Sequence, residues 1–239
     1  MTDLKGLRTV VTGASKGIGR AVAERLADEG AKLALMARTE ELLLERASDC
    51  NRRGAEARPY VCDVSDAQAV ADQFTAALEW LGGIDLLVNN AGLGYFGSIE
   101  DLSVGQFDEM IGTNLRGVFL CSRAVVPRMK SDGGGMIVNI ASIAGKSGSL
   151  GGAGYCASKF GVMGLNECMG LDLRSHGIRV TAICPGSVNA PDFRQGRSTR
   201  IKSENMIQAS DVAEAVAYVA HQPPRIFLRE IEIRLTRKE

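Results

Sequence analysis

The sequence predicts an α/β fold in which a doubly wound parallel sheet carries helices on both faces. Short apolar segments alternate along the chain with amphipathic segments of helical length, which is the pattern of repeated strand–helix units. The strand segments are apolar almost throughout, as expected for parallel strands that are buried on both faces. Right-handed crossovers then place helices on both sides of the sheet. Because no linker or repeat interrupts this pattern, we expect residues 1–239 to form a single domain.

The expected strands and helices follow one another in a regular order. Strands are expected at the short apolar runs 7–12, 32–37, 57–62, 84–88, 136–141 and 178–184, and at 226–235, where the residues alternate. Helices are expected at 17–29, 40–53, 66–81, 103–111, 115–130, 153–175 and 211–220. Gly30, Gly54 and Gly82 end the first three helices, and Ser65 is a candidate N-cap for the third. Pro185 ends the sixth strand.

The composition argues against several classes of protein. Lys and Arg together number 28, and Asp and Glu also number 28, so the formal net charge is zero. A general nucleic-acid binder needs a basic face, as does a protein of anionic membrane surfaces, and a balanced charge argues against both. No apolar run approaches the roughly 18 residues of a membrane span, and the first residues lack the apolar core of a signal peptide. We expect a soluble cytoplasmic protein.

The cysteines and histidines give no indication of metal or disulfide chemistry. The six cysteines are widely spaced and form no CxxC pair, so we interpret them as small buried hydrophobes in a reducing compartment. His176 and His221 are the two histidines. Two histidines give little basis for a histidine-based metal site or for a Ser-His-Asp triad, and we expect no metal.

A glycine-rich turn joins the first expected strand to the first expected helix. Residues 12–19 read TGASKGIG. A turn in this position directs backbone N–H groups and a helix N-terminus beyond the sheet edge, which suits a phosphate group. The alternative is an ordinary glycine-rich turn between a strand and a helix. The strand–helix–strand context favours a nucleotide site.

Polar residues also follow other strands at the same expected edge of the sheet. Asn89, Asn90, Ala91 and Gly92 come directly after the fourth strand, where a doubly wound sheet presents its carboxyl ends to a ligand. An Asn-rich turn that tolerates positive φ would have the same sequence. Ser142 lies just past the fifth strand, where it is a candidate site residue or a simple turn former.

Tyr155 and Lys159 lie four residues apart, on one face of the expected helix 153–175. Taken alone, such a pair usually belongs to a solvated helix face. Asn114 lies upstream, and its simplest interpretation is an N-cap that opens a helix. Each residue therefore has a structural explanation when it is considered by itself.

Together, however, these motifs resemble the short-chain dehydrogenase/reductase family from about residue 7 to residue 188. TGASKGIG, NNAG, Asn114, Ser142, the segment YCASK that starts at Tyr155 and ends at Lys159, and Pro185-Gly186 occur in the family's order and spacing. The resemblance implies a seven-stranded Rossmann-like sheet, a nicotinamide cofactor, and catalysis by Asn114, Ser142, Tyr155 and Lys159. The residues expected to bind the cofactor are Gly13, Ser15, Lys16, Gly17, Ile18, Gly19, Arg38, Asp63, Val64, Asn90, Ala91, Gly92, Tyr155, Lys159, Pro185, Gly186 and Val188.

The implied chemistry is physically reasonable for these side chains. Reduction of a carbonyl needs a proton donor near neutral pH, and a tyrosine with a pKa of about 10 is a poor match. A lysine ammonium a few ångströms away in a half-buried site is worth roughly 3–4 kcal/mol, which would lower the pKa of Tyr155 towards 7–8. The resemblance implies that Lys159 also holds the nicotinamide ribose and that Asn114 holds a water linking Lys159 to solvent. Ser142 would donate a hydrogen bond to the substrate oxygen.

The end of the second strand indicates which nicotinamide cofactor binds. An acid there would bind the adenosine ribose 2′-hydroxyl of NAD, whereas an Arg accommodates the 2′-phosphate of NADP. Residues 36–39 read MART, without an acid. Arg38 and Lys16 could be two ordinary surface cations, but their combination with the missing acid predicts NADP(H). Asp63 and Val64, after the third strand, resemble the family's adenine contact.

One residue departs from the family pattern beside the cofactor. After Pro185-Gly186 the family usually has a Thr that contacts the nicotinamide carboxamide, and Ala190 stands at that position here. We expect Ser187, Asn189 or the backbone of Val188 to make this contact instead.

The sequence does not identify the substrate. We expect segments 93–97, 146–154 and 190–208 to surround it, with 190–208 as a substrate lid. Between residues 190 and 202 of that lid, four cations outnumber one acid. This excess of positive charge fits either closure on an anionic substrate or a solvated loop. The cations are Arg194, Arg197, Arg200 and Lys202, and the acid is Asp192. The C-terminal segment lacks the glycine pair of many fatty-acid ketoacyl reductases, which favours other carbonyl substrates.

The leading prediction is an NADP(H)-dependent oxidoreductase that interconverts a carbonyl and a secondary alcohol, with Tyr155 as the acid/base. The alternatives are a 3-ketoacyl thioester reductase of the same family and a non-catalytic, NADPH-binding regulatory protein. The resemblance also implies a homodimer or homotetramer built on helices 115–130 and 153–175. The second of these helices carries more apolar positions than one core-facing stripe requires.

Overall fold

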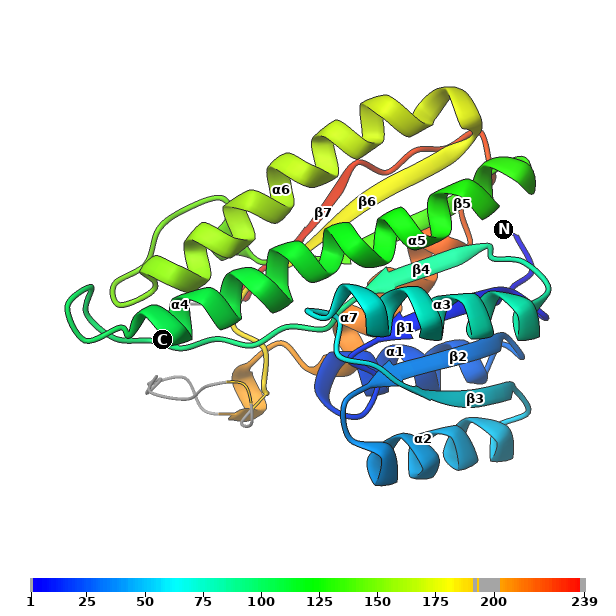
Figure 1. Ribbon diagram of the computed structural model, residues 1–239, viewed down its shortest axis with the longest axis horizontal. Helices are drawn as coiled ribbons and strands as arrows, with labels where there is room; N and C mark the ends of the chain where they lie inside the picture. The colour runs from blue at the N-terminus through cyan, green and yellow to red at the C-terminus, as the bar shows by residue number, and fades with distance from the viewer. Residues whose placement is uncertain (1, 191–192, 194–202, 237–239) are drawn as a thin grey trace.

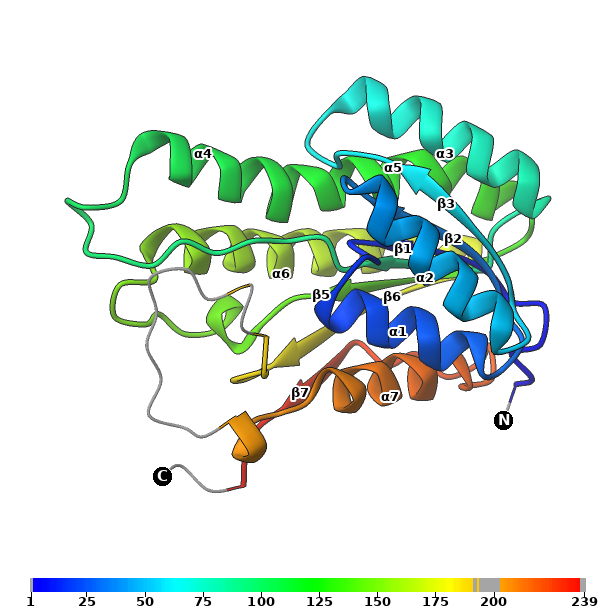
Figure 2. The ribbon, with the colours of Figure 1, turned by 90° about the horizontal axis from the view of Figure 1, so that it is seen from below.

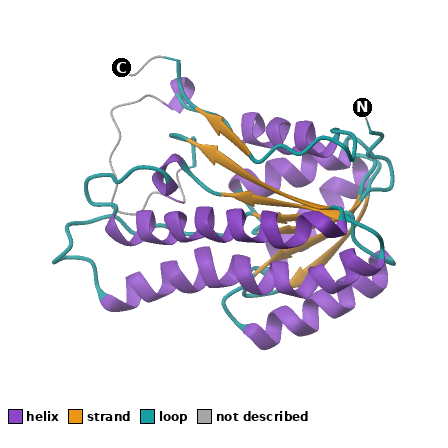
Figure 3. Cartoon of the chain, turned by 90° about the horizontal axis from the view of Figure 1, so that it is seen from above, coloured by secondary structure: helices purple, strands orange, loops and turns teal. Residues whose placement is uncertain are grey.

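Within residues 2–190, 193 and 203–236, which the computed structural model describes, seven parallel strands form one sheet in the order β3-β2-β1-β4-β5-β6-β7. The strands are β1 (Arg8–Thr12), β2 (Lys32–Ala37), β3 (Glu56–Val61), β4 (Leu86–Asn89), β5 (Gly135–Ile140), β6 (Ile178–Pro185) and β7 (Glu230–Ile233). The strand arrows all point to the same side of the molecule (Figure 3). The segments that follow the strands therefore meet at one edge, and the predicted doubly wound parallel sheet is confirmed.

Helices cover both faces of the sheet (Figures 1 and 2). Helices α1, α2 and α7 pack on one face, while α3, α5 and α6 pack on the other. Their bounds are α1 (Gly17–Ala27), α2 (Glu40–Arg52), α3 (Ala67–Leu81), α4 (Val104–Ile111), α5 (Gly117–Ser131), α6 (Ala153–Leu173) and α7 (Ala209–Ala220). Each predicted helix is present, with ends that differ by a few residues.

Each layer of helices has its own apolar core against the sheet. Successive strand residues point to opposite faces, so Val11 packs with Leu26 of α1 in one core, whereas Val10 packs with Phe74 of α3 and Val125 of α5 in the other. All five side chains are buried. Burial of each such side chain contributes roughly 1.5–3 kcal/mol, which explains why the strands read as continuous apolar runs.

The two helices predicted at 103–111 and 115–130 form one continuous path (Figure 1). They are joined by a π-helical turn, Gly112–Arg116. Asn114 lies fully buried inside this turn, so the interpretation of Asn114 as an N-cap is wrong. A π-turn adds one residue to a helical turn and is frequent at functional sites. Nothing in the sequence pattern distinguishes it from a break between two helices.

The predicted N-cap of α3 is also wrong by one residue. Asp66, not Ser65, caps the helix by accepting hydrogen bonds from the main-chain N–H groups of Gln68 and Ala69 at 2.8 and 3.2 Å. The Ser65 hydroxyl instead donates to the Asp63 carboxylate at 2.7 Å. Ser65 and Asp66 are both suitable caps. Because Asp63 binds the Ser65 hydroxyl, Asp66 caps the helix.

The last strand is shorter than the predicted segment 226–235. The carbonyl groups that precede β7 are bound by side chains of β6. Arg179 Nη1 donates to the Ile226 carbonyl at 3.0 Å, and Thr181 Oγ1 donates to the Leu228 carbonyl at 2.6 Å. Before Arg229, these side-chain contacts take the place of regular main-chain hydrogen bonds to β6, so β7 begins at Glu230.

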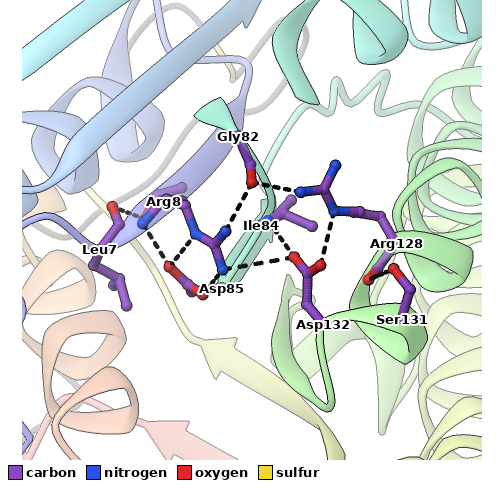
Figure 4. A network of polar contacts seen from close by, with 9 residues as sticks. Leu7, Arg8, Gly82, Ile84, Asp85, Arg128, Ser131 and Asp132 are labelled. Carbon is purple, nitrogen blue, oxygen red and sulfur yellow. Dashed lines mark hydrogen bonds and ion pairs between the residues drawn. The ribbon is translucent and has the colours of Figure 1, made fainter. Parts of the chain in front are cut away.

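An ion-pair network holds the edge of the sheet opposite the carboxyl ends of the strands (Figure 4). Arg8, at the start of β1, donates to both carboxylate oxygens of Asp85, from Nε at 2.9 Å and from Nη2 at 2.6 Å. Its Nη1 donates to the Gly82 carbonyl at 3.0 Å. Asp132 lies 3.6 Å from Arg8 Nη2 and accepts from Arg128 Nε of α5 at 2.8 Å. The network joins β1, the start of β4 and the end of α5.

Burial by itself would raise the pKa of Asp85, but the hydrogen bonds and charge of Arg8 outweigh it and hold that pKa below its usual value. We expect Asp85→Asn to lower the free energy of unfolding at pH 7 by about 1–2 kcal/mol, because the bidentate pair is only partly exposed. A carboxyl with a lowered folded-state pKa stabilises above its ordinary pKa of about 4. The difference between variant and wild type should therefore shrink as the pH falls below that value.

Urea denaturation at pH 7 and pH 3 would measure this difference. Asp108→Asn is the matched control, because it makes the same change at an exposed position on α4. Equal unfolding midpoints for the two variants at pH 7 would contradict the role given to Asp85.

Candidate active site

A cavity of about 760 Å³ lies where the strands end. Its lining includes residues that directly follow β1, β2, β3, β4, β5 and β6, together with residues of α4 and α6. This is the edge at which an open parallel sheet binds ligands. The two turns on either side of the reversal in strand order, after β1 and after β4, both contribute.

The lining contains nearly all the site residues predicted from the sequence. Those present are Gly13, Ser15, Lys16, Gly17, Ile18, Arg38, Asp63, Val64, Asn90, Ala91, Gly92, Ser142, Tyr155, Lys159, Pro185, Gly186 and Val188. Gly19 and Asn114 do not line the cavity. Both are buried behind it, and they support residues that do line it.

The turn after β1 is fastened to the turn after β4 by hydrogen bonds. Asn90 Nδ2 donates to the main-chain carbonyls of Thr12 and Gly13 at 3.0 and 3.2 Å. Thr12 Oγ1 accepts from the N–H groups of Asn90 and Ala91 at 3.0 and 3.1 Å. A Cβ on Gly19 would stand 2.2 Å from the Gly13 carbonyl oxygen. Glycine at 19 thus allows helix α1 to begin directly beneath this junction.

The N-terminus of α1 has the features of an anion site. Lys16 occupies the N-cap position in an extended conformation, and its side chain makes no capping hydrogen bond. Gly17 has φ +56°, and a Cβ there would meet nothing within 4 Å, so the space in front of the helix end is open. First-turn N–H groups that lack a side-chain cap attract phosphate. This end of the cavity fits the pyrophosphate of a dinucleotide.

Tyr155 and Lys159 both face the cavity from α6 and are both buried. Lys159 Nζ lies 5.9 Å from the centre of the Tyr155 ring and donates to the Ile140 carbonyl at the end of β5, at 2.8 Å. Only 5% of Lys159 is exposed, and this desolvation lowers the pKa of Lys159 to about 8. The ammonium therefore remains charged at neutral pH.

Ser142 follows β5 and lines the cavity beside these residues. Its Oγ accepts a hydrogen bond from the main-chain N–H of Ala144 at 3.1 Å. A hydroxyl has one hydrogen and two lone pairs. The contact with Ala144 uses a lone pair and leaves the hydrogen for an acceptor in the cavity.

Asn114 joins the loop after β4 to α6 from behind the cavity. Its Nδ2 donates to the Leu93 carbonyl at 2.9 Å and to Ser158 Oγ at 3.0 Å, while its Oδ1 accepts from the Leu93 N–H at 2.9 Å. Ser158 is the residue before Lys159. The contacts use both Nδ2 hydrogens and one lone pair of Oδ1, so the side chain fixes Leu93 and α6 relative to each other.

The rim of the cavity beyond β2 and β3 carries charged side chains. Arg38 follows β2 and is 63% exposed, with Nη1 4.0 Å from Asp63 Oδ2 and 3.9 Å from Glu109 Oε1. Burial raises the pKa of Asp63, but hydrogen bonds from Ser65 and the charge of Arg38 outweigh this, and the pKa is lowered. Sequence reasoning identified Arg38 and Asp63 but missed Glu109.

A helical signal in the sequence could have indicated Glu109. Thr113, directly before Asn114, lines the cavity together with Glu109, and the two lie four residues apart on one helix face. That signal becomes useful only when α4 is known to continue through the π-turn.

Aromatic side chains surround Tyr155. The rings of Phe96 and Phe193 each lie with their centres 5.5 Å from the centre of the Tyr155 ring. Gly94 lies against both rings, since a Cβ there would be 3.1 Å from Phe96 and 3.2 Å from Phe193. The cations and the acid predicted for the lid (Arg194, Arg197, Arg200, Lys202 and Asp192) lie outside the described residues.

The segment around Ala190 is held by main-chain pairing. Asn189 N donates to the Ile207 carbonyl at 2.8 Å, and Ile207 N donates to the Ser187 carbonyl at 3.1 Å. Asn189 Nδ2 donates to Gln208 Oε1 at 3.2 Å. Of the two side chains expected to replace the family's Thr, that of Asn189 is thus already engaged, which favours Ser187.

Among the described residues, no group of three or more His, Cys, Asp or Glu side chains is placed to hold a metal ion. None of the helices described is long and apolar enough to cross a membrane.

Comparisons with known proteins identify the family of the chain. A family model described as short chain dehydrogenase matches residues 8–201. An alcohol dehydrogenase from the archaeon Thermococcus sibiricus, complexed with 5-hydroxy-NADP, is 32% identical with a TM-score of 0.89, covering 97% of this chain and 98% of its own. A variant of actinorhodin polyketide ketoreductase with NADPH is 34% identical, with a TM-score of 0.89 and 98% of each chain covered. An NAD+-bound xylitol dehydrogenase is 29% identical, with a TM-score of 0.88, covering 97% of this chain and 99% of its own.

The burial of Lys159 generates a prediction about stability. We expect Lys159→Met to raise the free energy of unfolding by roughly 1–3 kcal/mol at pH 7, because it removes a cation whose charged form is disfavoured by burial. The folded-state pKa of about 8 lies below the unfolded value of about 10.4. The gain should therefore be complete below pH 8 and should disappear as the pH rises towards 10.4.

Urea denaturation at pH 7 and pH 10 would measure this gain, with the exposed Lys130→Met as control. If Lys159→Met were no more stable than Lys130→Met at pH 7, the cost assigned to the buried ammonium would be wrong.

Proposed function

The chain belongs to the short-chain dehydrogenase family, and from that premise we propose that it is an NADP(H)-dependent oxidoreductase that interconverts a carbonyl and a secondary alcohol. The observation that carries the proposal is the convergence of Ser142, Tyr155 and Lys159 in one cavity with the uncapped N-terminus of α1. The first three supply proton-transfer chemistry, and the helix end supplies a phosphate site.

The proposed cofactor fits the residues that are present. The open N-terminus of α1 and the turn from Gly13 to Ile18 would hold the pyrophosphate, and Asp63 and Val64 would contact the adenine. Asn90, Ala91 and Gly92 lie between these groups and the reacting centre, and Pro185, Gly186 and Val188 would contact the nicotinamide. When bound, the nicotinamide donates or accepts the hydride.

The proposed catalytic roles follow from the contacts of each side chain. Tyr155 holds the proton that passes to or from the substrate oxygen. Lys159, charged at neutral pH and desolvated, stabilises the phenolate and so brings the acid closer to neutral pH. Ser142 keeps its hydroxyl hydrogen for the substrate oxygen, where negative charge develops. Asn114 positions Leu93 and α6, and the second lone pair of its Oδ1 is available for the predicted water link to Lys159.

The proposed preference for NADP(H) rests on the rim of the cavity. Arg38 follows β2, where no acid stands, and Lys16 lines the same cavity. Two cations give a phosphate charge-assisted hydrogen bonds that a hydroxyl cannot match. The similar structures hold NADP-type cofactors in two cases and NAD+ in a third, so the family alone does not decide, and these side chains carry the proposal.

The surroundings of Tyr155 favour substrates with an apolar or planar group beside the carbonyl. Phe96, Phe193 and Leu93 line the cavity, and the ring centres of Phe96 and Phe193 lie 5.5 Å from that of Tyr155. A 3-ketoacyl thioester is the second candidate substrate, and similarity to a polyketide ketoreductase supports it.

A non-catalytic NADPH sensor is the alternative from another class. A sensor has no physical need for a tyrosine and a lysine buried together beside a serine hydroxyl, so the site argues against it. Oxidation of NADPH with any carbonyl in a panel of aryl and alkyl ketones, 3-ketoacyl thioesters, hydroxy-acid precursors and sugars would reject it.

We also propose that the chain works as a single-domain homodimer or homotetramer in the cytoplasm. Helices α5 and α6 expose Phe119, Phe160 and Leu171, and a contact between identical copies would cover such side chains. The cysteines of the described structure are all free, which suits a reducing compartment.

Tyr155→Phe should lower kcat by about 10²–10⁴-fold, because it removes the proton donor and leaves the ring. Steady-state oxidation of NADPH with the best ketone of the panel would measure the loss. Tyr218→Phe removes the same atom from an exposed residue of α7 and serves as control. Retention of near wild-type turnover by Tyr155→Phe, with a substrate for which chemistry limits the rate, would disprove the assignment.

The wild type should prefer NADPH to NADH by about 10²-fold in kcat/KM, since each charge-assisted contact is worth roughly 1.5–3 kcal/mol. The double change Ala37→Asp with Arg38→Leu should reverse the preference, because it places a carboxylate at the end of β2 and removes the guanidinium. Measurement of kcat/KM with both cofactors tests this. A wild type that prefers NADH would show that Arg38 and Lys16 are ordinary surface cations.

A further inference from the structure

A chain of polar contacts crosses the rim of the cavity from the loop after β4 to the turn after β3. The hydroxyl of Tyr95 donates to Glu109 Oε2 at 2.7 Å. Glu109 Oε1 lies 3.9 Å from Arg38 Nη1, and Asp63 Oδ2 lies 4.0 Å from the same nitrogen. All four residues line the cavity. Arg38 Nη1 therefore lies within 4.0 Å of two carboxylates.

The two carboxylates are held in different ways. Asp63 Oδ1 accepts hydrogen bonds from the N–H and the hydroxyl of Ser65 at 2.9 and 2.7 Å, so this side chain is fixed to its own turn. Glu109 is held by the single phenol of Tyr95, and 41% of its side chain is exposed. Glu109 is thus the carboxylate that can change its distance from Arg38 at little cost.

Any anion that pairs with Arg38 lies next to Glu109. A 2′-phosphate would have to compete with Glu109 for the guanidinium, and the two negative groups would repel each other at a separation of a few ångströms. The 2′-hydroxyl of NAD carries no charge and meets no such repulsion.

We infer that Glu109 is a cofactor-selectivity residue, which weakens the binding of the 2′-phosphorylated cofactor and brings the affinities for NADPH and NADH closer together. This inference rests on the proposed pairing of Arg38 with the 2′-phosphate. Glu109 acts from α4, away from the end of β2, and Tyr95 holds it in place. The selectivity of the site is then a balance of the cations Arg38 and Lys16 against one movable anion.

The test is the dissociation constant of each reduced cofactor, measured by fluorescence titration without substrate. Glu109→Gln should tighten NADPH binding by about three- to tenfold at low ionic strength, because it removes a like charge from a partly exposed site. The gain should diminish at high salt. NADH binding should change by less than about twofold. Asp108→Asn makes the same charge change on the neighbouring residue, which does not line the cavity, and should leave both constants unchanged.

A second pair of variants tests the coupling to Arg38 and Tyr95. In an Arg38→Leu background, Glu109→Gln should tighten NADPH binding by a smaller factor, because the competition for the guanidinium no longer exists. Tyr95→Phe leaves the charge of Glu109 in place but frees it to move away, so it should give part of the gain of Glu109→Gln.

The outcomes separate this inference from the proposed function. If Arg38→Leu weakens NADPH binding and Glu109→Gln behaves like Asp108→Asn, the inference about Glu109 is overturned while the NADP(H) proposal stands. If Arg38→Leu leaves NADPH binding unchanged, the proposed pairing is wrong and the inference falls with it. A selective, salt-dependent gain in Glu109→Gln that shrinks without Arg38 supports both.

Discussion

The hydrogen bonds from Asn90 to the carbonyls of Thr12 and Gly13 join the two halves of the molecule where the strand order reverses. Strand β1 leads to β2 and β3 on one side, while β4 leads to β5, β6 and β7 on the other. The cavity needs the ends of both groups of strands at a fixed separation, since the N-terminus of α1 follows β1 and Ser142 follows β5. The ladder between β1 and β4 pairs the two groups of strands along their length. Asn90 and the hydroxyl of Thr12 extend that connection beyond the ends of the strands, and Arg8 and Asp85 hold the opposite edge.

The reacting end depends on a second constraint, the burial of Lys159 against the Ile140 carbonyl. Desolvation lowers the pKa of this ammonium and costs stability, and the same desolvation strengthens its effect on the Tyr155 phenol. The aromatic rings of Phe96 and Phe193 keep that region apolar. Burial of Lys159 therefore lowers the free energy of unfolding while it favours the proposed chemistry. The large apolar cores on both faces of the sheet offset this loss of stability.

The sequence predicted the sheet and the helices, and nearly all the site residues that it predicted line the cavity, because those features depend on apolar period and on motif spacing. The sequence-based predictions were wrong or incomplete where a local conformation or contact depends on a residue that is distant in the sequence. Asn114 lies in a π-turn because Leu93 and Ser158 bind its side chain, and neither is near in sequence. Asp66 caps α3 because Asp63 engages Ser65. Glu109 was missed because its contacts are with Arg38, which follows β2, and with Tyr95, which lies in the loop after β4.

These observations divide the cavity into two chemical environments. At the rim near Arg38 the charges are exposed, so their interactions are screened by water and salt and respond to single substitutions by modest factors. Around Tyr155 the charge of Lys159 is enclosed by rings and main chain. At the same separation, its interaction with the phenol is therefore far stronger than an interaction between the exposed charges at the rim. If the proposed cofactor pairing holds, residues such as Glu109 would adjust recognition of the 2′-phosphate without altering the proposed proton transfer. At the buried end, the ammonium that lowers stability is the group that the proposed proton transfer needs, so a substitution of Lys159 would gain stability at the expense of that chemistry.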